Sequence, residues 1–492
     1  MPTHPSAAVP LALPPRVPGE PATRWLYQAL RGEILSGRLR PGARLPPTRD
    51  FARHHAVARG TVVLAFEQLA AEGYLEATVG SGTFVARLLP DRLLHAGRPE
   101  RAVPLPRPRP RRLSGYGRRA TLFENFEPGR VRAFRCHQPA LDLFPTTLWG
   151  TLAARRLRQA STHLLLSAPP LGYQPLREAV AEYLATSRGV ACTPERVAIV
   201  SGTQEALDLA ARLFLDAGDR VALEDPGYSG AAQVFQALSA RLVPVPVDDE
   251  GMVLDRKRLD GTRLVYLTPA HQFPLGVSMS LARRLALLEW ARGAGAVLLE
   301  DDYDSEYRYA GRPLPALQGL DRSGSVIFAG SFSKVLFPAL RLGYLVLPED
   351  LVDRFAAAQS LTHRHAGYLE QVVLTDFITQ GHFGRHLRRM REVYAGRLGV
   401  LLEEVKSRLA GALEIGGVEA GLQTAGWLAP GLDASTIAER LAARDVEATP
   451  LSRYRRGRVT RADRDGLLLG FAAVDAEEIR RGVREVERVV GG

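Results

Sequence analysis

The chain has 492 residues, of which 46% are apolar and 24% are charged. This length predicts two or more folded units, and the composition is that of a globular protein. No run reaches the roughly 18 apolar residues that a membrane span needs, and the first residues lack the regions of a signal peptide. The two cysteines, Cys136 and Cys192, cannot build a disulfide framework. We therefore expect a cytoplasmic protein that does not associate with membranes.

The net charge of +11 arises in the first quarter of the chain. Residues 1–120 hold 19 arginines and 8 acidic residues, whereas the remainder is neutral. Within this part, Pro104–Arg112 consists mainly of prolines and arginines, which favour an extended linker over a packed core. Local positive charge is typical of proteins that bind a polyanion, and a solvated linker explains the run equally well. The pattern predicts a disordered tail over residues 1–21, a small folded unit over 22–86, a basic Pro/Arg-rich linker over 87–120 and a large folded unit over 121–492.

In the small unit, the patterning predicts three helices followed by a hairpin. The apolar residues Leu26, Leu30 and Ile34 recur every four positions, as in an amphipathic helix. Glycines in the segment 79–82 allow the tight turn of a hairpin. The expected elements are helices over 25–36 and 48–54, a third helix that ends at Gly73 and carries Val63, Phe66 and Leu69 or Ala70 on one face, and strands over 75–78 and 83–86. This arrangement is a winged helix-turn-helix.

Several blocks of this unit closely resemble the GntR-type DNA-binding domain. They are, in chain order, Leu45–Asp50, Arg59–Val62, Glu72–Leu75 and Gly80–Val85. The resemblance implies double-stranded DNA as a partner. Arg59 and Thr61 would lie at the start of a helix in the major groove, and Arg49 would contact a backbone phosphate. Gly80 would let the wing approach the minor groove closely.

The large unit alternates short apolar runs with helical patterns. The expected strands are 197–200, 221–223, 242–247, 264–267, 297–300, 326–329 and 342–346. Helices lie between most of them, for example over 205–215 and 281–292. Apolar strands separated by helices predict an α/β fold, with a mainly parallel sheet covered on both faces. In such folds the functional residues lie at the carboxyl ends of the strands.

Reactive residues follow these strands. Ser201–Gln204 opens a helix and would offer backbone N–H groups to an anion. Tyr228 follows the second strand, Asp301–Glu306 supplies carboxylates and a phenol, and Lys334 follows the sixth strand. The chain has only three lysines, and Lys334 alone lies outside a charged context, which suggests a need for an amine that can lose its proton. An anion cradle, a stacking ring, a carboxylate, a phenol and a lysine are together what pyridoxal 5′-phosphate requires.

These blocks resemble the fold-type I aminotransferases, and the whole chain looks like the MocR group of GntR regulators, in which a winged helix is fused to an aminotransferase-like domain. The resemblance implies that Lys334 forms a Schiff base with pyridoxal phosphate. Asp301 would bond the pyridine nitrogen, Tyr303 the ring oxygen, and Tyr228 would stack on the ring. The phosphate would be held by Gly202, Thr203, Ser331, Ser333 and Arg341. Asp302 is the alternative to Asp301, which we choose for its spacing to Tyr303.

Two positions depart from the aminotransferase pattern. Phe273 stands where those enzymes usually carry an asparagine that bonds the ring oxygen, so one oxygen contact is lost. Ser167 lies roughly where the family often has a tyrosine that reaches the phosphate in the partner subunit.

Arg453 is a candidate for binding the carboxylate of an effector. The histidines lack companions at ligand spacing, so we expect no metal site.

We predict a transcriptional regulator that binds DNA through residues 22–86. Its large unit would sense pyridoxal phosphate, or an amino compound that forms an external aldimine with it. The ligand alters the DNA-binding heads only if it binds two conformations unequally. The alternative is an aminotransferase with an appended DNA-binding module, and residual transaminase activity is compatible with Lys334, Asp301 and Tyr303. The resemblance also implies a homodimer whose two heads read repeated half-sites in a promoter.

Overall fold

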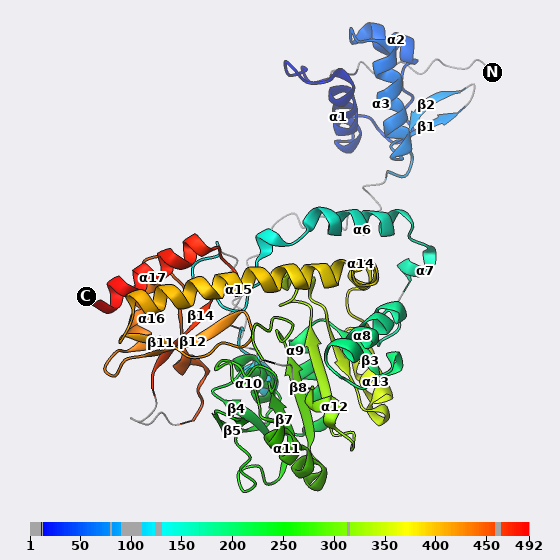
Figure 1. Cartoon of the computed structure of the whole chain (residues 1–492). Coiled ribbons are helices and arrows are strands. Elements are labelled where there is room, and N and C mark those ends of the chain that lie inside the picture. The colour runs from blue at the N-terminus through cyan, green and yellow to red at the C-terminus, as the bar shows by residue number, and fades with distance from the viewer. Residues whose placement is uncertain are drawn as a thin grey trace, which may run out of the picture. The chain divides into compact units, whose positions relative to one another are not determined.

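The structure is a computed structural model, and the chain forms two compact units, Met1–Arg111 and Arg112–Gly492 (Figure 1). It describes residues 11, 13–78, 81–89, 111–123, 130–166, 168–311, 315–457 and 464–491. Each unit has its own core of buried apolar side chains. None of the helices in these ranges is both long and apolar enough to cross a membrane.

The N-terminal unit consists of three helices and a two-stranded wing. Its elements are α1 (Ala22–Leu35), α2 (Thr48–His54), α3 (Arg59–Ala71), β1 (Leu75–Thr78) and β2 (Gly82–Val85). The strands pair antiparallel, with Leu75 opposite Val85. All five elements contribute side chains to one core, in which the rings of Phe51 and Phe66 meet edge to face at 5.5 Å. The predicted winged helix-turn-helix is confirmed.

The buried face of α3 differs from the predicted one. Val63 is half-buried and Ala70 is exposed. The buried side chains are those of Val62, Ala65, Phe66 and Leu69. These four follow the i, i+3, i+4, i+7 spacing of one helical face, so the stripe begins one residue earlier than we expected.

Residues flanking this unit also have definite contacts. Leu11, within the predicted tail, is buried against the core of the N-terminal unit, and Trp25 Nε1 donates to the backbone oxygen of Pro14 at 3.0 Å. Apolar burial and this hydrogen bond hold that part of the segment. Gly80, the predicted wing contact, lies outside the described residues.

Within the predicted linker, α5 (Gly115–Arg119) packs against the large unit. The Arg119 guanidinium donates to the backbone oxygens of Gln236 and Ala237, at 3.0 and 3.1 Å. These oxygens lie at the C-terminal end of α10 (Ser229–Ala237). Phe123 meets the ring of Tyr228, the residue that precedes α10, at 6.1 Å. Residues 119–123 therefore run along α10, antiparallel to it, and the four peptide units between Arg119 and Phe123 are long enough, when extended, to span this helix.

The large unit is built on an eight-stranded mixed sheet of order β3-β10-β9-β8-β7-β4-β5-β6. The strands are β3 (Val197–Val200), β4 (Arg220–Asp225), β5 (Arg241–Asp248), β6 (Gly251–Met252), β7 (Thr262–Leu267), β8 (Val297–Asp302), β9 (Val326–Ser331) and β10 (Gly343–Val346). Strands β5, β4, β7, β8 and β9 are parallel neighbours, whereas β10 runs antiparallel to β9 and β3. All seven predicted strands occur, and the mainly parallel sheet is confirmed.

Helices cover both faces of this sheet, as predicted. One face packs against α9 (Thr203–Phe214), α10 and α13 (Val352–Thr362), and the other against α11 (Leu281–Ala294) and α12 (Leu317–Leu320). Strand alternation produces the two cores: in β7, Leu264 and Tyr266 face the first layer, and Val265 and Leu267 face the second. The unit also contains α6 (Thr146–Arg158), α7 (Thr162–Leu165), α8 (Gln174–Ser187) and α14 (Tyr368–Thr379).

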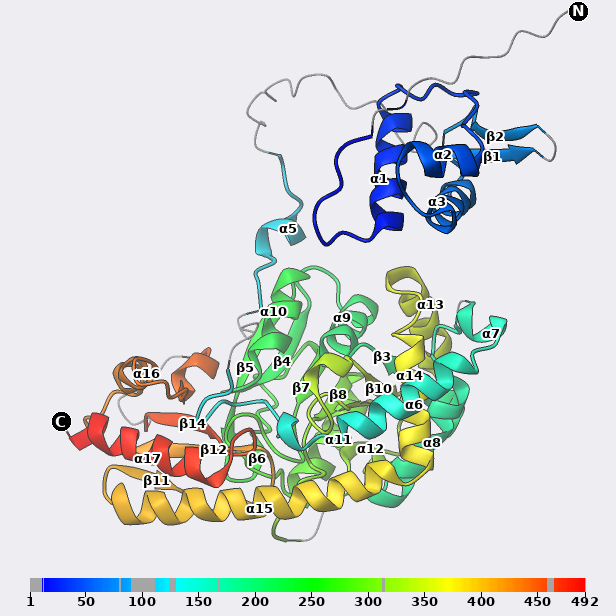
Figure 2. The same ribbon diagram turned by 90° about the horizontal axis from the view of Figure 1, so that it is seen from above.

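A second sheet, of four antiparallel strands, was not predicted. It consists of β11 (Leu413–Ile415), β12 (Gln423–Leu428), β13 (Thr449–Pro450) and β14 (Gly466–Gly470), in the order β11-β12-β14-β13. It packs with α15 (His382–Arg408), α16 (Ala434–Ala442) and α17 (Ala476–Gly491). Figure 2 shows α15 and α17 side by side along this sheet. Apolar residues of these elements, of α8 and of α14 join one core.

The N-terminal unit has a small core, so losing one large side chain should unfold it. Phe51 is 1% exposed, and we expect Phe51→Ala to cost about 3–5 kcal/mol, a large part of the stability of so small a unit. Hydrogen exchange of the full chain should show lost amide protection over residues 22–85 and unchanged protection in the large unit. Leu64→Ala, at a position 56% exposed, is the control and should keep protection. Equal effects of the two substitutions would contradict the assigned core.

Candidate functional site

The predicted site residues of the large unit gather at the carboxyl ends of its parallel strands. Asp301 lies near the end of β8, and Lys334 follows β9 by three residues. Gly202 and Thr203 lie between β3 and α9, and Tyr228 lies between β4 and α10. Parallel strands bring these segments, distant in sequence, to one edge of the sheet. Arg49, Arg59 and Thr61 belong to the other unit, where Arg59 is exposed at the first turn of α3 and Arg49 is exposed on α2.

Lys334 is held in a dry environment. Its Nζ donates to the backbone oxygen of His137 at 2.8 Å. Burial lowers the pKa of Lys334 to about 8, although the carboxylates of Asp304 and Asp301 act in the opposite direction. A lysine with an ordinary pKa is almost entirely protonated at neutral pH, whereas this amine is partly neutral. The Lys334 nitrogen can therefore act as a nucleophile.

Asp301 and Asp302 differ sharply in their surroundings, although they are adjacent. Asp301 Oδ2 accepts a hydrogen bond of 2.7 Å from the hydroxyl of Tyr266, and Oδ1 is buried with no partner among the described residues. Burial raises the pKa of Asp301 to about 7. Asp302 lies 2.5 Å from Nη2 of Arg188 in a buried ion pair. Alternation along β8 sends them to opposite faces, so the charge of Asp302 is paired with Arg188, whereas Asp301 has no cationic partner at ion-pair distance among the described residues.

Residues near the start of α9 form an anion cradle. Gly202 caps the helix with φ +104°, a conformation that favours glycine, and a Cβ there would lie 3.5 Å from Nη2 of Arg341. The Arg341 guanidinium therefore lies beside the N–H groups that open the helix, which favours a bound anion. The Ser331 hydroxyl accepts from the Ser333 N–H at 3.2 Å. Ser333 Oγ is buried and unpartnered among the described residues.

Aromatic rings line the space around Lys334 and Asp301. The Tyr228 hydroxyl accepts from Gln204 Nε2 at 2.8 Å, and burial raises the pKa of Tyr228 to about 12. The ring of Phe273 stands edge-on to Tyr228 at 6.0 Å, and Tyr303 lies 6.2 Å from Phe273. Each of these rings removes water from the site, which is the cause of the shifted pKa values.

The arrangement fits the chemistry of pyridoxal phosphate. Asp301 Oδ1 is an unused acceptor for a protonated ring nitrogen, and Ser333 Oγ is an unused group beside the anion cradle. The cradle itself would hold a phosphate dianion through backbone N–H groups and Arg341. A partly neutral Lys334 completes the set, because the cofactor aldehyde bonds an uncharged amine.

Several residues of this site were missed in the sequence. Tyr266 could have been noticed as the one polar group in the predicted strand 264–267, and Gln204 as the neighbour of Thr203. His137, whose backbone oxygen accepts from Lys334, carries no sequence signal, since 197 residues separate the two. Arg453, exposed in the short helix Leu451–Tyr454, adjoins Tyr454, whose ring lies 4.9 Å from Phe273. Ser167 lies outside the described residues.

Comparisons with known proteins agree with both units. Residues 146–484 match the family described as Aminotransferase class I and II, and residues 22–85 match the family described as Bacterial regulatory proteins, gntR family. The chain is 40% identical over 467 residues to the probable rhizopine catabolism regulatory protein MocR of Rhizobium meliloti, covering 95% of this chain and 93% of that protein. It is 30% identical over 487 residues to the HTH-type pyridoxine biosynthesis transcriptional regulator PdxR of Corynebacterium glutamicum, covering 98% and 99% of the two chains.

A solved structure has the fold of the large unit. LysN, an α-aminoadipate aminotransferase from Thermus thermophilus, was crystallised with N-(5′-phosphopyridoxyl)-L-leucine. It superposes with a TM-score of 0.70 at 31% sequence identity, and the match covers 77% of this chain and 97% of that chain. The comparison confirms the predicted fold-type I aminotransferase architecture.

The two adjacent carboxylates should respond oppositely to amidation in the cofactor-free protein. The pKa of Asp301 is raised from 3.8 to about 7, so its ionisation costs stability as the pH rises through this range. Asp301→Asn should therefore be more stable than wild type at pH 8, by roughly 1–3 kcal/mol, and the gain should vanish toward pH 4. Asp302→Asn should lose about 3–5 kcal/mol at neutral pH, because it leaves Arg188 buried and unpaired.

Urea unfolding at several pH values measures both effects. The two variants differ in position by one residue, so each is the control for the other. A loss of stability at pH 8 in both would mean that Asp301 is not a buried, strained carboxylate.

Proposed function

We propose, since this chain belongs to the MocR group of gntR-family transcriptional regulators, that its large unit binds pyridoxal 5′-phosphate and responds to it or to an amino compound that reacts with it. The observation that carries the proposal is a partly neutral Lys334 within reach of the charge of Asp301, which has an unused oxygen, in a chain that also has a winged helix.

When bound, pyridoxal phosphate supplies an aldehyde that condenses with amines and a ring that withdraws electrons. Lys334 would anchor the aldehyde, and Asp301 would hold the proton of the ring nitrogen. Tyr228 would cover the ring face and exclude water, and Tyr303 would donate to the ring oxygen. The phosphate would be held by Gly202, Thr203, Ser331, Ser333 and Arg341.

An amine effector would compete with Lys334 for the same aldehyde. Arg453, near the rim formed by Tyr454 and Phe273, is our candidate for its carboxylate. The effector changes DNA binding only if it binds two conformations of the protein with different affinity. The contact of Phe123 with Tyr228 supports such coupling, because the segment that leads to the N-terminal unit touches the proposed cofactor-stacking ring.

We infer that Arg49, Arg59, Thr61 and Gly80 contact double-stranded DNA. We further propose that the protein is a homodimer, so that two N-terminal units read repeated half-sites. A DNA-binding role agrees with a cytoplasmic location. The second candidate, an aminotransferase that carries a DNA-binding module, is favoured by the complete set of Lys334, Asp301 and Tyr303.

Removing the Lys334 amine should abolish covalent attachment of the cofactor. Wild type mixed with pyridoxal phosphate should develop the yellow absorbance of an aldehyde joined to a lysine, and Lys334→Ala should not. In wild type, the rate at which this absorbance appears should rise with pH and level off above about pH 8, where most of the Lys334 amine is neutral. Lys406→Ala, on the exposed part of α15, is the matched control and should behave like wild type.

The same spectra distinguish the two functions. An amine that shifts the absorbance without yielding a keto acid supports the regulator, whereas steady production of keto acid supports the aminotransferase. Absence of the band in wild type would rule out the proposed cofactor role.

Phosphate contact by Arg49 can be tested without knowing the operator. For any duplex DNA, the slope of log affinity against log salt should fall by about 0.9 in Arg49→Ala, since one counterion fewer is released. Arg24→Ala removes the same charge from an exposed position on α1 and should leave the slope nearly unchanged. Equal slopes for wild type and Arg49→Ala would remove Arg49 from the interface.

A further inference from the structure

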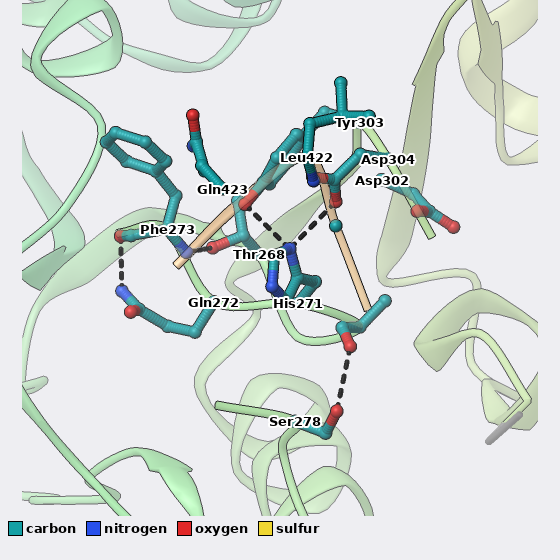
Figure 3. Close-up of polar contacts among 12 residues, drawn as sticks. Thr268, His271, Gln272, Phe273, Ser278, Asp302, Tyr303, Asp304, Leu422 and Gln423 are labelled. Atoms are coloured by element: carbon teal, nitrogen blue, oxygen red, sulfur yellow. Dashed lines mark hydrogen bonds and ion pairs between the residues drawn. The ribbon is translucent and has the colours of Figure 1, made fainter. Parts of the chain in front are cut away.

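His271 has a role that neither the sequence nor the comparisons assign. It lies in the loop after β7, is 5% exposed, and its Nδ1 atom meets two groups of the segment that follows β8. Asp304 Oδ1 lies 2.9 Å from Nδ1, and the Tyr303 hydroxyl lies 3.2 Å from the same atom (Figure 3). One ring nitrogen thus connects a buried carboxylate to the phenol that we place at the cofactor oxygen.

The position of the imidazole proton follows from Asp304. This carboxylate is 1% exposed, and its second oxygen accepts from the Leu422 N–H at 3.3 Å. If Nδ1 carried no proton, its lone pair would face the lone pairs of Oδ1 at 2.9 Å. Burial alone would lower the pKa of His271, but the charge and the hydrogen bond of Asp304, together with the charge of Asp302, raise it. Nδ1 therefore carries a proton and donates it toward Asp304.

The proton on Nδ1 determines the direction in which the Tyr303 hydroxyl can donate its hydrogen bond. The single N–H of Nδ1 is shared between Asp304 Oδ1 at 2.9 Å and the Tyr303 oxygen at 3.2 Å, so toward Nδ1 the hydroxyl oxygen can only accept and its own O–H points elsewhere. Among the residues described, His271 is the one hydrogen-bond partner of that hydroxyl. The Tyr303 proton is thus kept available, and the N–H that it accepts polarises the phenol and makes it a stronger donor.

The imidazole is fixed in place by two glycines. A Cβ at Gly421 would lie 2.1 Å from Cε1, and a Cβ at Gly276 would lie 3.3 Å from Nε2. Both glycines have positive φ, +95° and +78°. No larger residue would fit at Gly421 without moving the ring, so the backbone on two sides is shaped around His271.

Neighbouring groups leave Tyr303 as the donor on this side of the site. Phe273 stands where the aminotransferases that this chain resembles carry an asparagine, and its ring cannot donate. The other charges acting on His271 are Asp302 and Arg308, and those acting on Tyr303 include Asp301 and Glu224. Of the charged groups that act on His271, Asp304 is the one at hydrogen-bond distance from its ring.

We propose that His271 is a positioning residue: held by Asp304, it directs the Tyr303 proton toward the ring oxygen of the cofactor and strengthens that hydrogen bond. The proposal rests on the proposed function, because it assumes pyridoxal phosphate on Lys334. The stronger hydrogen bond from Tyr303 would compensate in part for the hydrogen bond that an asparagine at position 273 would donate and that Phe273 cannot.

The pKa of the yellow chromophore on Lys334 measures this effect in the full-length, cofactor-loaded protein. A donor at the ring oxygen makes the chromophore lose its proton more easily. In His271→Ala, absorbance titration should show a proton affinity about three- to tenfold higher than in wild type. Tyr303→Phe should raise it at least as much, and the double variant should match Tyr303→Phe, because His271 acts through Tyr303.

Asp304→Asn provides an isosteric test if His271→Ala does not fold. The amide would donate to the one lone pair of Nδ1 and hold the imidazole in the tautomer protonated at Nε2, so Tyr303 would lose the N–H that it accepts. The chromophore should again hold its proton more tightly. His386→Ala is the control, because His386 is also buried but contacts the backbone oxygen of Val335, and it should titrate like wild type.

An unchanged titration in Asp304→Asn, or a His271→Ala shift that adds fully to that of Tyr303→Phe, would overturn the role of His271 while the cofactor proposal stands. A wild type that forms no chromophore at all would overturn both.

Discussion

Exclusion of water from the edge of the large sheet is the constraint on which the site depends. The same desolvation that lowers the pKa of Lys334 to about 8 raises that of Asp301 to about 7. At neutral pH a fraction of the amine is therefore uncharged and a fraction of the carboxyl group is protonated, and such shifted pKa values are typical of binding and catalytic sites. The apolar parallel strands and the surrounding aromatic rings exclude water from these groups.

The end of β8 illustrates how one strand places three consecutive carboxylates in three roles. Glu300 accepts from the backbone N–H groups of Leu317 and Gln318, at 2.8 and 2.9 Å, and so fixes the start of α12. The charge of Asp302 is paired with that of Arg188, whereas Asp301 has no cationic partner at ion-pair distance among the described residues and keeps one oxygen unbonded. A buried acid without a full partner is costly, and its presence here is better explained by ligand binding than by stability.

The strands of the large sheet could be predicted from the sequence because each is a continuous apolar run. The winged helix could be predicted because its turns carry glycine and proline. The second sheet was missed, since β13 has two residues and β11 three, too few for any periodicity. The choice between Asp301 and Asp302 could not be made from composition, because it depends on which face of β8 meets Arg188. His271 carried no signal either, since its meaning comes from Asp304 and Leu422, 33 and 151 positions away.

The segment that runs along α10 bears on how the linker can be engineered. Residues 119–123 are part of the packing of the large unit, because Arg119 bonds the end of α10 and Phe123 meets the ring of Tyr228. A deletion within 119–123 therefore does more than shorten the connection to the N-terminal unit, because it uncaps the end of α10 and removes a ring that contacts Tyr228. Comparisons of linker length among related chains are meaningful only when this docked portion is counted with the large unit.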